Sequence, residues 1–295
     1  MDSLGASKVN RLQALVRFSL SSLPQPYGRA FVQRIVLRHP VRTLQGLLRY
    51  WKLSASSPLE RWLMQVDEAE FVKLAARDGE RLLVTTGFCQ KPLGTAPASA
   101  RPALAPGGGE DGGGAERTTG CPAERFNHDC AFLPSFVIGK GGETQPPCWA
   151  CRGCFIRVLS AAALRAGASF AVLTSAQDVA DDILLPALEE EQFTRVLFAI
   201  CPYSVEAMSL ALLICGVEGA IFTYHSGSCT NYREWLRADG GDKPGRTVLS
   251  PDTMDRMLRL LDLISAHRHS SSLPQMTHYQ QSQHVYRPRD APQLF

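Results

Sequence analysis

An alternation of apolar strand-like runs and helix-like segments between Arg81 and Tyr224 constrains the fold of this chain more than any other feature. The strand-like runs are 81–87, 169–174, 195–200 and 220–224, and helical patterns fill 155–166, 178–191 and 203–214. Each strand-like run is continuously apolar, as in parallel strands that are buried on both faces. The pattern predicts an α/β fold with a parallel-sheet, three-layer, Rossmann-like core and an N-terminal helical extension.

Three regions follow from this pattern. We predict a basic N-terminal helical segment at 1–79, a cysteine-rich α/β domain at 80–266 and a disordered tail at 267–295. Residues 94–119 are rich in Gly, Ala and Pro and are predicted to be a disordered insertion within the domain. The tail holds His267, His269, His278 and His284, for which a solvated tail is a better account than a metal site because their spacing is irregular.

Capping patterns predict where several helices begin. Ser57-Pro58-Leu59-Glu60 has the form of a capping box with proline at the first helical position, so a helix with Trp62 and Val66 on its buried side is expected. Asp67 with Glu70 predicts a second helix to about Arg77, and Ser175 with Asp178 is expected to open the helix at 178–191. Ser250-Pro251 begins a last helix that is expected to reach about Ala266.

The net charge of +3 is concentrated near the N-terminus. No acidic residue lies between Asp2 and Glu60, an interval that holds nine basic residues. Residues 8–22 and 30–52 have helical amphipathic patterns. Such a segment can contact an anionic membrane surface or an acidic partner through residues 8–52, it can be an organellar targeting peptide, or it can be a helical subdomain with solvated arginines. We favour the subdomain; nucleic-acid binding is unsupported.

Nine cysteines and the absence of an export signal indicate a reducing, cytoplasmic location. No apolar run approaches the ~18–20 residues that cross a bilayer. Three cysteines form a C-x-x-C-x-x-C motif at Cys148, Cys151 and Cys154, directly before a predicted helix. A helix N-terminus lowers thiol pKa and favours the thiolate that metals bind.

Further cysteines follow the predicted strands. Cys89 follows the first strand, Cys201 the third and Cys229 the fourth. The carboxyl ends of parallel strands lie at one edge of a sheet, where open α/β folds bind ligands, so we expect these thiols to converge there. Cys121 and Cys130 lie in a loop, and a ligand role for them is evenly balanced. Cys215 lies in an apolar run and is assigned to the core.

Eight cysteines are therefore candidate ligands. They are Cys89, Cys121, Cys130, Cys148, Cys151, Cys154, Cys201 and Cys229. Thiolate ligation suits iron–sulfur clusters and zinc. A compact C-x-x-C-x-x-C with a distant fourth cysteine favours one or two [4Fe–4S] clusters, and zinc is the alternative.

Other polar residues near this edge carry weaker signals. His128-Asp129 can be an alternative ligand or a proton shuttle, and a hydrogen-bonded loop pair is the simpler interpretation. Tyr203, His225 and Asn231 can surround a metal or substrate. The motifs of nucleotide-binding loops, zinc proteases and serine hydrolases are absent from the sequence.

The order of the motifs resembles a prokaryotic cysteine-rich family of unknown function. The resemblance rests on Cys89, Cys121-Pro122-Ala123, the Cys148–Cys154 motif, Cys201-Pro202-Tyr203 and Ser228-Cys229-Thr230-Asn231, and covers roughly residues 80–235. Gly153 lies one position later than in that pattern, and Tyr232 replaces a threonine. The resemblance implies iron–sulfur binding through these cysteines and implies no reaction.

Three functional hypotheses follow. The first is a cytoplasmic iron–sulfur protein that acts in electron transfer with a redox partner protein, or as a redox enzyme or accessory. The second is a zinc-stabilised interaction module that docks through its basic N-terminal helices. The third is a cysteine-dependent enzyme that uses a thiol of low pKa such as Cys201.

Overall fold

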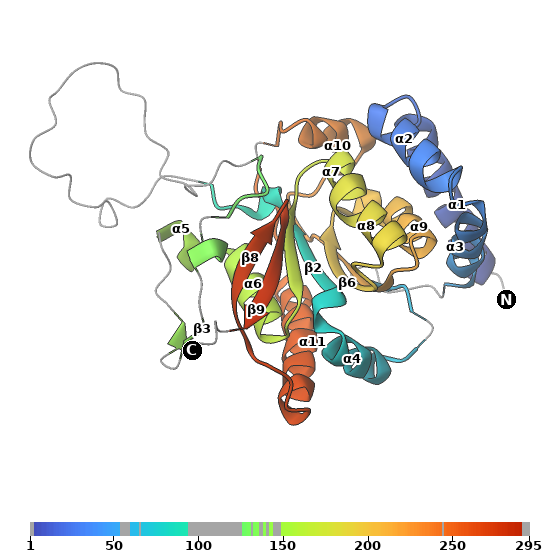
Figure 1. The fold of residues 1–295 in the computed structure, drawn as a ribbon. Helices are drawn as coiled ribbons and strands as arrows, with labels where there is room; N and C mark the ends of the chain where they lie inside the picture. Colours follow the sequence, from blue (N-terminus) through green and yellow to red (C-terminus); the bar gives the residue numbers. More distant parts are fainter. Residues whose placement is uncertain are drawn as a thin grey trace, which may run out of the picture.

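One mixed sheet with helices packed around it forms the centre of the molecule (Figure 1). The structure is a computed structural model. It describes residues 3–53, 60–64, 66–93, 126–130, 132–135, 138–139, 142–143, 149–243 and 245–290. The predicted insertion at 94–119 lies outside the described residues.

Helices and strands alternate through the centre of the chain, as predicted. The α-helices are α1 (Ser3–Ser22), α2 (Pro26–Phe31), α3 (Pro40–Lys52), α4 (Glu68–Arg77), α5 (Trp149–Arg152), α6 (Phe155–Arg165), α7 (Ala176–Val179), α8 (Leu185–Glu190), α9 (Val205–Ile214), α10 (Tyr232–Asp239) and α11 (Pro251–Ser270). The strands are β1 (Glu60–Trp62), β2 (Leu82–Gly87), β3 (Ile138–Gly139), β4 (Gly142–Glu143), β5 (Ser169–Leu173), β6 (Arg195–Ile200), β7 (Glu218–Thr223), β8 (Met276–Ser282) and β9 (Val285–Asp290). Single 3₁₀ or π-helical turns are η1 (Val32–Val36), η2 (Gly79–Arg81), η3 (Phe88–Gln90), η5 (Leu133–Ser135), η6 (Ala180–Leu184) and η7 (Pro202–Ser204).

Seven of the described strands form the main sheet in the order β1-β7-β6-β2-β5-β9-β8. The four central strands β7, β6, β2 and β5 are parallel, which agrees with the α/β prediction. β1 pairs antiparallel with β7, and β9 pairs antiparallel with β5 and with β8. The sheet is therefore mixed, with a parallel centre and antiparallel edges.

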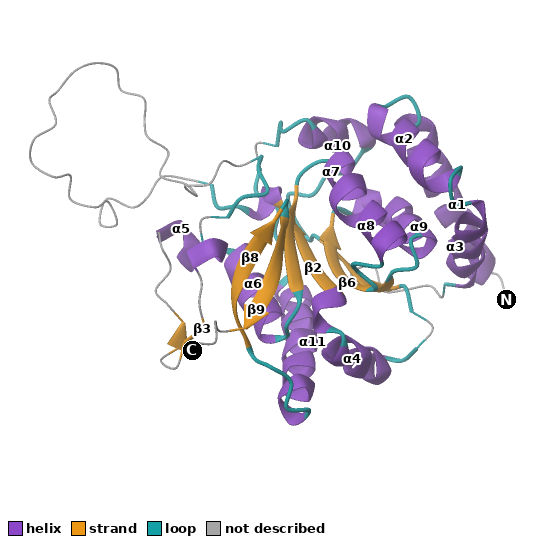
Figure 2. Cartoon of the chain, viewed as in Figure 1, coloured by secondary structure: helices purple, strands orange, loops and turns teal. Residues whose placement is uncertain are grey.

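Apolar side chains on both faces of the sheet explain the continuous apolar runs. Leu82 and Val84 of β2 belong to one buried cluster, together with side chains of α4, α6 and α11. Leu83, between them in sequence, belongs to a second cluster, with side chains of α3, α8 and α9. Successive strand residues point to opposite faces, so helices cover both faces of the central strands (Figure 2).

Side-chain caps fix the starts of several helices, as the sequence predicted. Asp67 accepts a hydrogen bond from the Glu70 backbone N–H at 2.8 Å and caps α4. Ser175 and Asp178 form a reciprocal capping box at α7. Ser250 caps α11, with Pro251 at its first position. Each such cap stabilises a helix by about 1 kcal/mol.

The prediction of a helix that begins at Ser57-Pro58 is wrong. Residues 57–59 lie outside the described residues, but Glu60–Trp62 form β1, which pairs with Ala220–Phe222 of β7. α4 packs on α11 below the same sheet. Residues 60–77 thus belong to the α/β unit, because pairing with a strand about 160 residues away overrides a local capping pattern.

The prediction of a disordered tail is also wrong for residues 267–290. α11 continues to Ser270, and β8 and β9 form a hairpin that joins the sheet beside β5. Tyr279 and Tyr286 of this hairpin are buried. Residues 291–295 lie outside the described residues. The polar Gln and Ser residues between the buried positions concealed the strand pattern.

The basic N-terminal segment is helical, as predicted, and packs against the α/β unit (Figure 1). The single helix predicted at 30–52 is divided, because the chain leaves the helix before Pro40, which disfavours a helical residue in front of it. Tyr50 of α3 donates a hydrogen bond to Glu206 of α9, which also pairs with Arg61 of β1. Within the described residues, none of the helices combines the length and apolar character needed to cross a membrane.

Candidate functional site

The strand order places a crevice at the carboxyl ends of β2 and β6. The chain leaves β2 through α6, which packs on one face of the sheet, and leaves β6 through α9, which packs on the other. Neighbouring parallel strands whose connections diverge in this way open a ligand-binding crevice between them. Cys89 lies in η3 directly after β2, and Cys201 directly follows β6, so two predicted ligand positions flank this crevice.

Cys229 joins them through the loop that follows β7. Ser226 and Val248 form an isolated bridge that folds this loop back. Gly227 has φ +64°, and a Cβ there would lie 2.1 Å from the Arg246 carbonyl oxygen, so the turn requires glycine. The Cys201 thiol donates a hydrogen bond to Cys229. Cys89, Cys201 and Cys229 are called the strand-end cysteines below.

Cys229 has a depressed thiol pKa. Hydrogen bonds from Cys201 and from Lys243, whose Nζ lies 3.3 Å from Cys229 Sγ, lower the pKa of Cys229 to about 6 despite burial. The same contact, together with burial, raises the pKa of Cys201 well above its usual value. The prediction of a low pKa at Cys201 is therefore wrong, because a neighbouring thiolate outweighs its position at a helix start.

Cys89 is held by polar groups around its sulfur. Thr247 Oγ1 donates to Cys89 Sγ at 2.8 Å, and the Thr247 backbone N–H donates to the Cys89 carbonyl at 3.0 Å. Tyr224, fully buried, accepts from the Gly87 N–H at 2.7 Å and donates to the Ala199 carbonyl at 2.9 Å. These contacts fix the strand ends on which Cys89 and Cys201 sit.

A second group consists of Cys130, Cys151 and Cys154, called the helix-entry cysteines below. All three line one internal cavity of about 10 Å³ together with Phe132 and Arg157. Cys154 has extended backbone angles at the start of α6, as predicted. The Cys130 backbone N–H donates to Tyr286 Oη at 3.0 Å, so the C-terminal hairpin positions this cysteine. Of the two loop cysteines, Cys130 is thereby placed beside the central motif.

Arg246 connects the two groups. Its guanidinium donates to the Gln90 carbonyl at 3.1 Å, next to Cys89, and to the Gly153 carbonyl at 2.9 Å, next to Cys154. It also lies over the Phe155 ring, 5.3 Å from the centroid. Both cysteine groups therefore occupy adjoining parts of the same edge of the sheet.

The remaining cysteines fall outside these groups or outside the described residues. Cys121 and Cys148, two predicted ligands, lie outside the described residues. Cys215 is buried in the apolar cluster around α9, as predicted, and burial raises its pKa to about 12. Cys215 therefore serves as an internal control for a cysteine without a ligand role.

The donor sets fit thiophilic metals. Sulfur donors select zinc and iron–sulfur clusters over magnesium and calcium. The helix-entry cavity has about the room that one water molecule needs, so a single ion enters it more easily than a cluster does. The strand-end cysteines instead line a cavity of about 510 Å³, which leaves ample space for a cluster.

A different set of potential metal-ligand atoms lies beside β5. Ligand atoms of His128, Asp182 and His284 lie within 4.8 Å of one another. The two imidazole rings stack at 3.9 Å and 7°, so their in-plane lone pairs run side by side and do not converge. His128 Nδ1 contacts the Val172 carbonyl and its Nε2 contacts Thr174 Oγ1, each at 2.9 Å. These contacts agree with the interpretation of His128 as a hydrogen-bonded loop residue.

Three other predicted residues have structural surroundings. Asn231 caps α10 by accepting from the Glu234 N–H at 3.0 Å. Tyr203 packs against Phe18 and Tyr232. His225 is exposed. The sequence analysis missed Tyr224, Lys243, Arg246 and Thr247, because only the fold of the loops after β7 and α10 brings them to the cysteines.

Comparison with known proteins identified no relative. No protein family matches the chain, and neither the curated proteins nor the solved structures include a match.

Proposed function

We propose that this chain binds at least one iron–sulfur cluster through cysteines at the carboxyl edge of its sheet, and acts in electron transfer or as a redox enzyme or accessory protein. The observation that supports this most is the grouping of thiols from distant segments at that edge. Cys89, Cys201 and Cys229 come from three different strand ends, and single structural cysteines have no reason to gather in this way. The resemblance to the prokaryotic cysteine-rich family implies the same ligands.

The proposal includes the finer description of the core and its location. Helices on both faces of the parallel centre support a three-layer, Rossmann-like core. The clustered thiols support a location in the cytoplasm, where thiols stay reduced.

Residues of this chain would set the reduction potential of a bound cluster. An iron–sulfur cluster supplies one-electron chemistry. Hydrogen bonds to the ligating sulfurs raise its reduction potential, and Thr247 and Lys243 already donate such bonds to Cys89 and Cys229. The redox partner protein would approach this edge.

The direct test is anaerobic purification followed by an absorption spectrum and by iron, zinc and acid-labile sulfide analysis. We expect a brown protein with broad absorption near 400 nm, about four irons per cluster, and sulfide in equal amount. Colourless protein with stoichiometric zinc and no sulfide would refute the cluster and establish the zinc-stabilised alternative.

Cysteine variants then separate the two groups. We expect Cys201→Ala to remove the iron of the cluster, since the strand-end cysteines line the larger cavity, and Cys151→Ala to lower the content of the single metal ion that the smaller cavity admits. Cys215→Ala is the matched control, since this buried cysteine lies in the core around α9, and its iron content should equal that of the wild type. Unchanged iron in both ligand variants would contradict the assignment.

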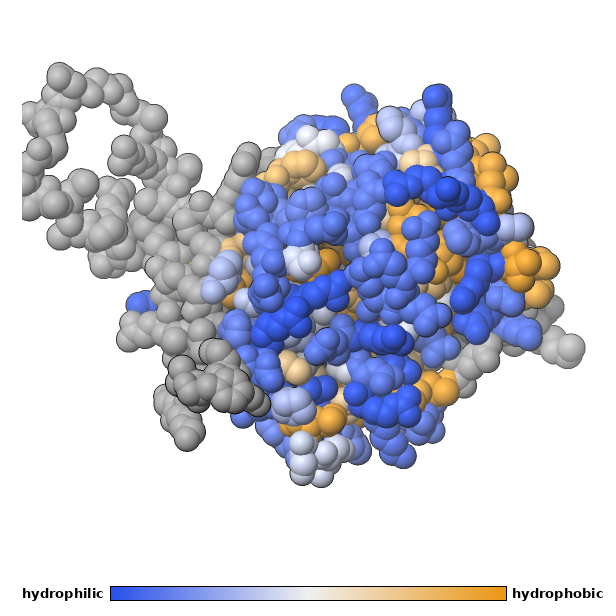
Figure 3. Space-filling model, in the orientation of Figure 1, coloured by the Kyte–Doolittle hydropathy of each residue, from blue (hydrophilic) through white to orange (hydrophobic). Residues whose placement is uncertain are grey.

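A second candidate function is docking on an anionic membrane surface. Leu37, Val41, Leu44, Leu48 and Trp51 recur at helical spacing on η1–α3 and are 51–68% exposed. Four of the five are followed directly by a basic residue, and these basic residues form a parallel stripe: Arg38, Arg42, Arg49 and Lys52. Figure 3 shows apolar surface on the side of the molecule where α2 and α3 lie. Apolar and basic stripes side by side are typical of interfacial helices.

Vesicle sedimentation tests this docking. We expect the protein to bind vesicles that contain phosphatidylserine and not vesicles of phosphatidylcholine alone. The double variant Arg38→Glu/Arg49→Glu should weaken binding strongly, since each basic residue contributes about 1 kcal/mol near such a surface. Leu263→Ser, on exposed α11, is the matched control and should bind normally. Equal binding to both vesicle types would rule the interface out.

A further inference from the structure

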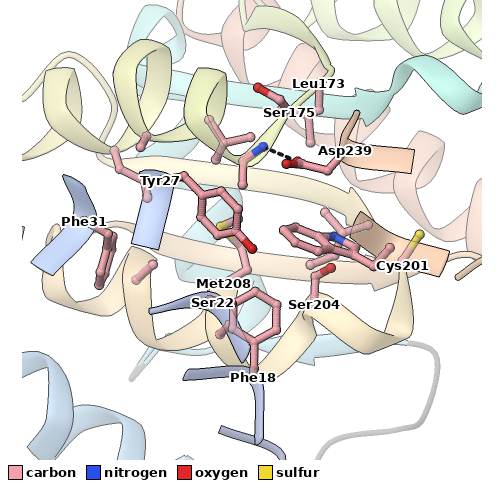
Figure 4. A pocket seen from close by; sticks show the side chains of 18 of the residues that line it. Phe18, Ser22, Tyr27, Phe31, Leu173, Ser175, Cys201, Ser204, Met208 and Asp239 are labelled. Atoms are coloured by element: carbon pink, nitrogen blue, oxygen red, sulfur yellow. Dashed lines mark hydrogen bonds between the residues drawn. The ribbon is translucent and has the colours of Figure 1, made fainter. Parts of the chain in front are cut away.

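A large apolar cavity lies between the N-terminal helices and the carboxyl edge of the sheet (Figure 4). Its volume of about 510 Å³ falls within the range of about 300–1,000 Å³ that accommodates small organic ligands. The walls are mostly carbon. They include Phe18 and Phe31 of the N-terminal helices, Leu173 at the end of β5, and Met208 and Ala211 of α9.

Specific contacts hold the N-terminal helices over this cavity. Tyr27 Oη and Tyr232 Oη lie 3.1 Å apart, and Tyr232 Oη donates to the Ser21 carbonyl at 2.7 Å. A Cβ on Gly28 would lie 2.0 Å from the Ser22 carbonyl oxygen, so the turn between α1 and α2 is tightly closed. The cavity therefore lies between helices α1 and α2 and the sheet edge, which these contacts hold together. Protein interiors are normally closely packed, so an open space of this size is a distinct feature of the fold.

Among the described residues that line this mainly apolar space, Asp239 at the end of α10 is the one acidic side chain, and Lys243 and the strand-end cysteines line it too. Its Oδ1 accepts from the Ala176 backbone N–H at 2.6 Å, and its second carboxylate oxygen has no hydrogen-bond partner among the described residues. Burial raises the pKa of Asp239 to about 6. The negative charge of Asp178 adds to this rise, and the hydrogen bond from Ala176 opposes it. A buried carboxylate of this kind is stabilised by a donor.

Aromatic rings stand beside this carboxyl group. The Tyr27 and Trp235 rings lie 5.6 Å apart at 72°, and the Phe18 and Trp235 rings lie 5.5 Å apart at 66°. Figure 4 shows Tyr27 extending into the cavity opposite Asp239. Aromatic faces attract cations and donor groups. The site thus combines an apolar body with one acceptor and aromatic neighbours.

We propose that this cavity binds an elongated apolar molecule whose head group is a hydrogen-bond donor, an amine or a hydroxyl, that contacts Asp239. The tail lies between α9 and the N-terminal helices. A carboxylate head at this position is disfavoured by repulsion from Asp239, and Lys243, the basic residue among the described lining residues, already donates a hydrogen bond to Cys229. The proposal goes beyond cluster binding, since none of Asp239, Tyr27 and Trp235 is a candidate ligand.

Displacement of the neutral fluorescent probe Nile red from the full-length protein at pH 7.5 tests the site. We expect dodecylamine and dodecanol to displace the probe at concentrations about tenfold or more below that of dodecanoic acid. In Asp239→Asn the preference for dodecylamine over dodecanoic acid should shrink by about tenfold. Equal displacement by all three compounds in the wild type, or an unchanged preference in Asp239→Asn, would overturn the proposal.

Two further variants locate the probe. Ala207→Trp fills the cavity from α9 and should abolish probe binding, with a circular dichroism spectrum and cooperative melting that confirm folding. Leu263→Ser alters the exposed face of α11 and should leave binding unchanged. Probe binding that survives in Ala207→Trp would place the probe outside the cavity and refute the cavity site. Because the strand-end cysteines line the same cavity, displacement is measured on protein of known iron and zinc content and again on the metal-free protein. A preference for dodecylamine in the metal-free protein tests this proposal separately from the cluster.

Discussion

Two neighbouring carboxylates, Asp178 and Asp239, show how contacts decide the behaviour of single residues. Asp178 accepts hydrogen bonds from Ser175 and Thr174 and lies near His128; although burial acts to raise its pKa, these contacts hold that pKa below its usual 3.8. Asp239 accepts one hydrogen bond within the described part of the chain, from the Ala176 N–H, and burial raises its pKa to about 6. The ionised form of Asp178 therefore stabilises the folded state, whereas the ionised form of Asp239 destabilises it.

The first prediction is a pH-dependent gain of stability in Asp239→Asn. A raised folded pKa means that the folded state loses stability as pH rises from about 4 to 6 and stays destabilised above 6. The variant should be more stable than wild type at pH 7.5, by at most about 3 kcal/mol at 1.36 kcal/mol per pKa unit, and equal to it below pH 4. Urea unfolding across pH 3.5–8 measures this.

Asp178→Asn is the matched comparison. Its folded pKa is depressed, so its stabilising contribution is present above pH 4 and is lost as pH falls further. This variant should be less stable than wild type at pH 7.5. If both variants shifted in the same direction at pH 7.5, the contrast between the two carboxyl environments would be wrong.

At the scale of elements, α3 shows how close packing attaches the N-terminal segment. Gly46 faces α9, and a Cβ there would lie 2.6–2.7 Å from atoms of Ile214, two of them backbone atoms. Glycine permits this approach of two helices, and it lowers the intrinsic stability of α3 by about 1 kcal/mol relative to alanine. The packing of α3 on α9 compensates that cost.

The second prediction concerns Gly46→Ala. Despite the better helix propensity, we expect it to destabilise the protein by about 1–2 kcal/mol, because overpacking against the α9 backbone forces the helices apart. Gly240→Ala is the control: its Cβ would lie 3.6 Å from the Arg237 carbonyl oxygen and 3.7 Å from that of Leu236, and a change within about 0.5 kcal/mol is expected. A stabilised Gly46→Ala in urea unfolding would argue against this close contact.

At the scale of the whole molecule, the C-terminal hairpin connects the sheet to the candidate site. Tyr286 and Tyr279 are both buried in it. Tyr286 Oη accepts from the Cys130 N–H at 3.0 Å and donates to the His128 carbonyl at 3.3 Å. Tyr279 Oη donates to the Ser160 and Ala168 carbonyls at 3.1 and 3.2 Å. One hydroxyl thus holds the loop with Cys130, and the other holds α6 and the start of β5.

The third prediction separates these roles. Tyr286→Phe and Tyr279→Phe should each lower stability by about 1–2 kcal/mol, because each leaves buried polar groups without their partner. Faster amide hydrogen exchange at residues 126–130 should appear only in Tyr286→Phe. Equal exchange in both variants would mean that the hairpin does not position Cys130.

The sequence by itself determined the parts of this protein that depend on local pattern. Continuous apolar runs identified β2, β5, β6 and β7, and capping residues located the starts of α4, α7 and α11. The positions of Cys89 and Cys201 after strands placed them at one edge, because parallel strands share that edge. These features follow from burial and hydrogen bonding within a few residues, which a local sequence window reflects.

Only the tertiary structure decided what depends on distant partners. Pairing with β7 made Glu60–Trp62 a strand in spite of a helix-start pattern, and pairing with β5 ordered a polar tail into β8 and β9. The loops after β7 and α10 brought Lys243 to Cys229. The depressed thiol pKa therefore belongs to Cys229 and not, as the sequence predicted, to Cys201. The cavity exists because α1 and α2 cover the sheet edge without filling it. None of these pairings leaves a local signal, since the partners are far apart in the sequence.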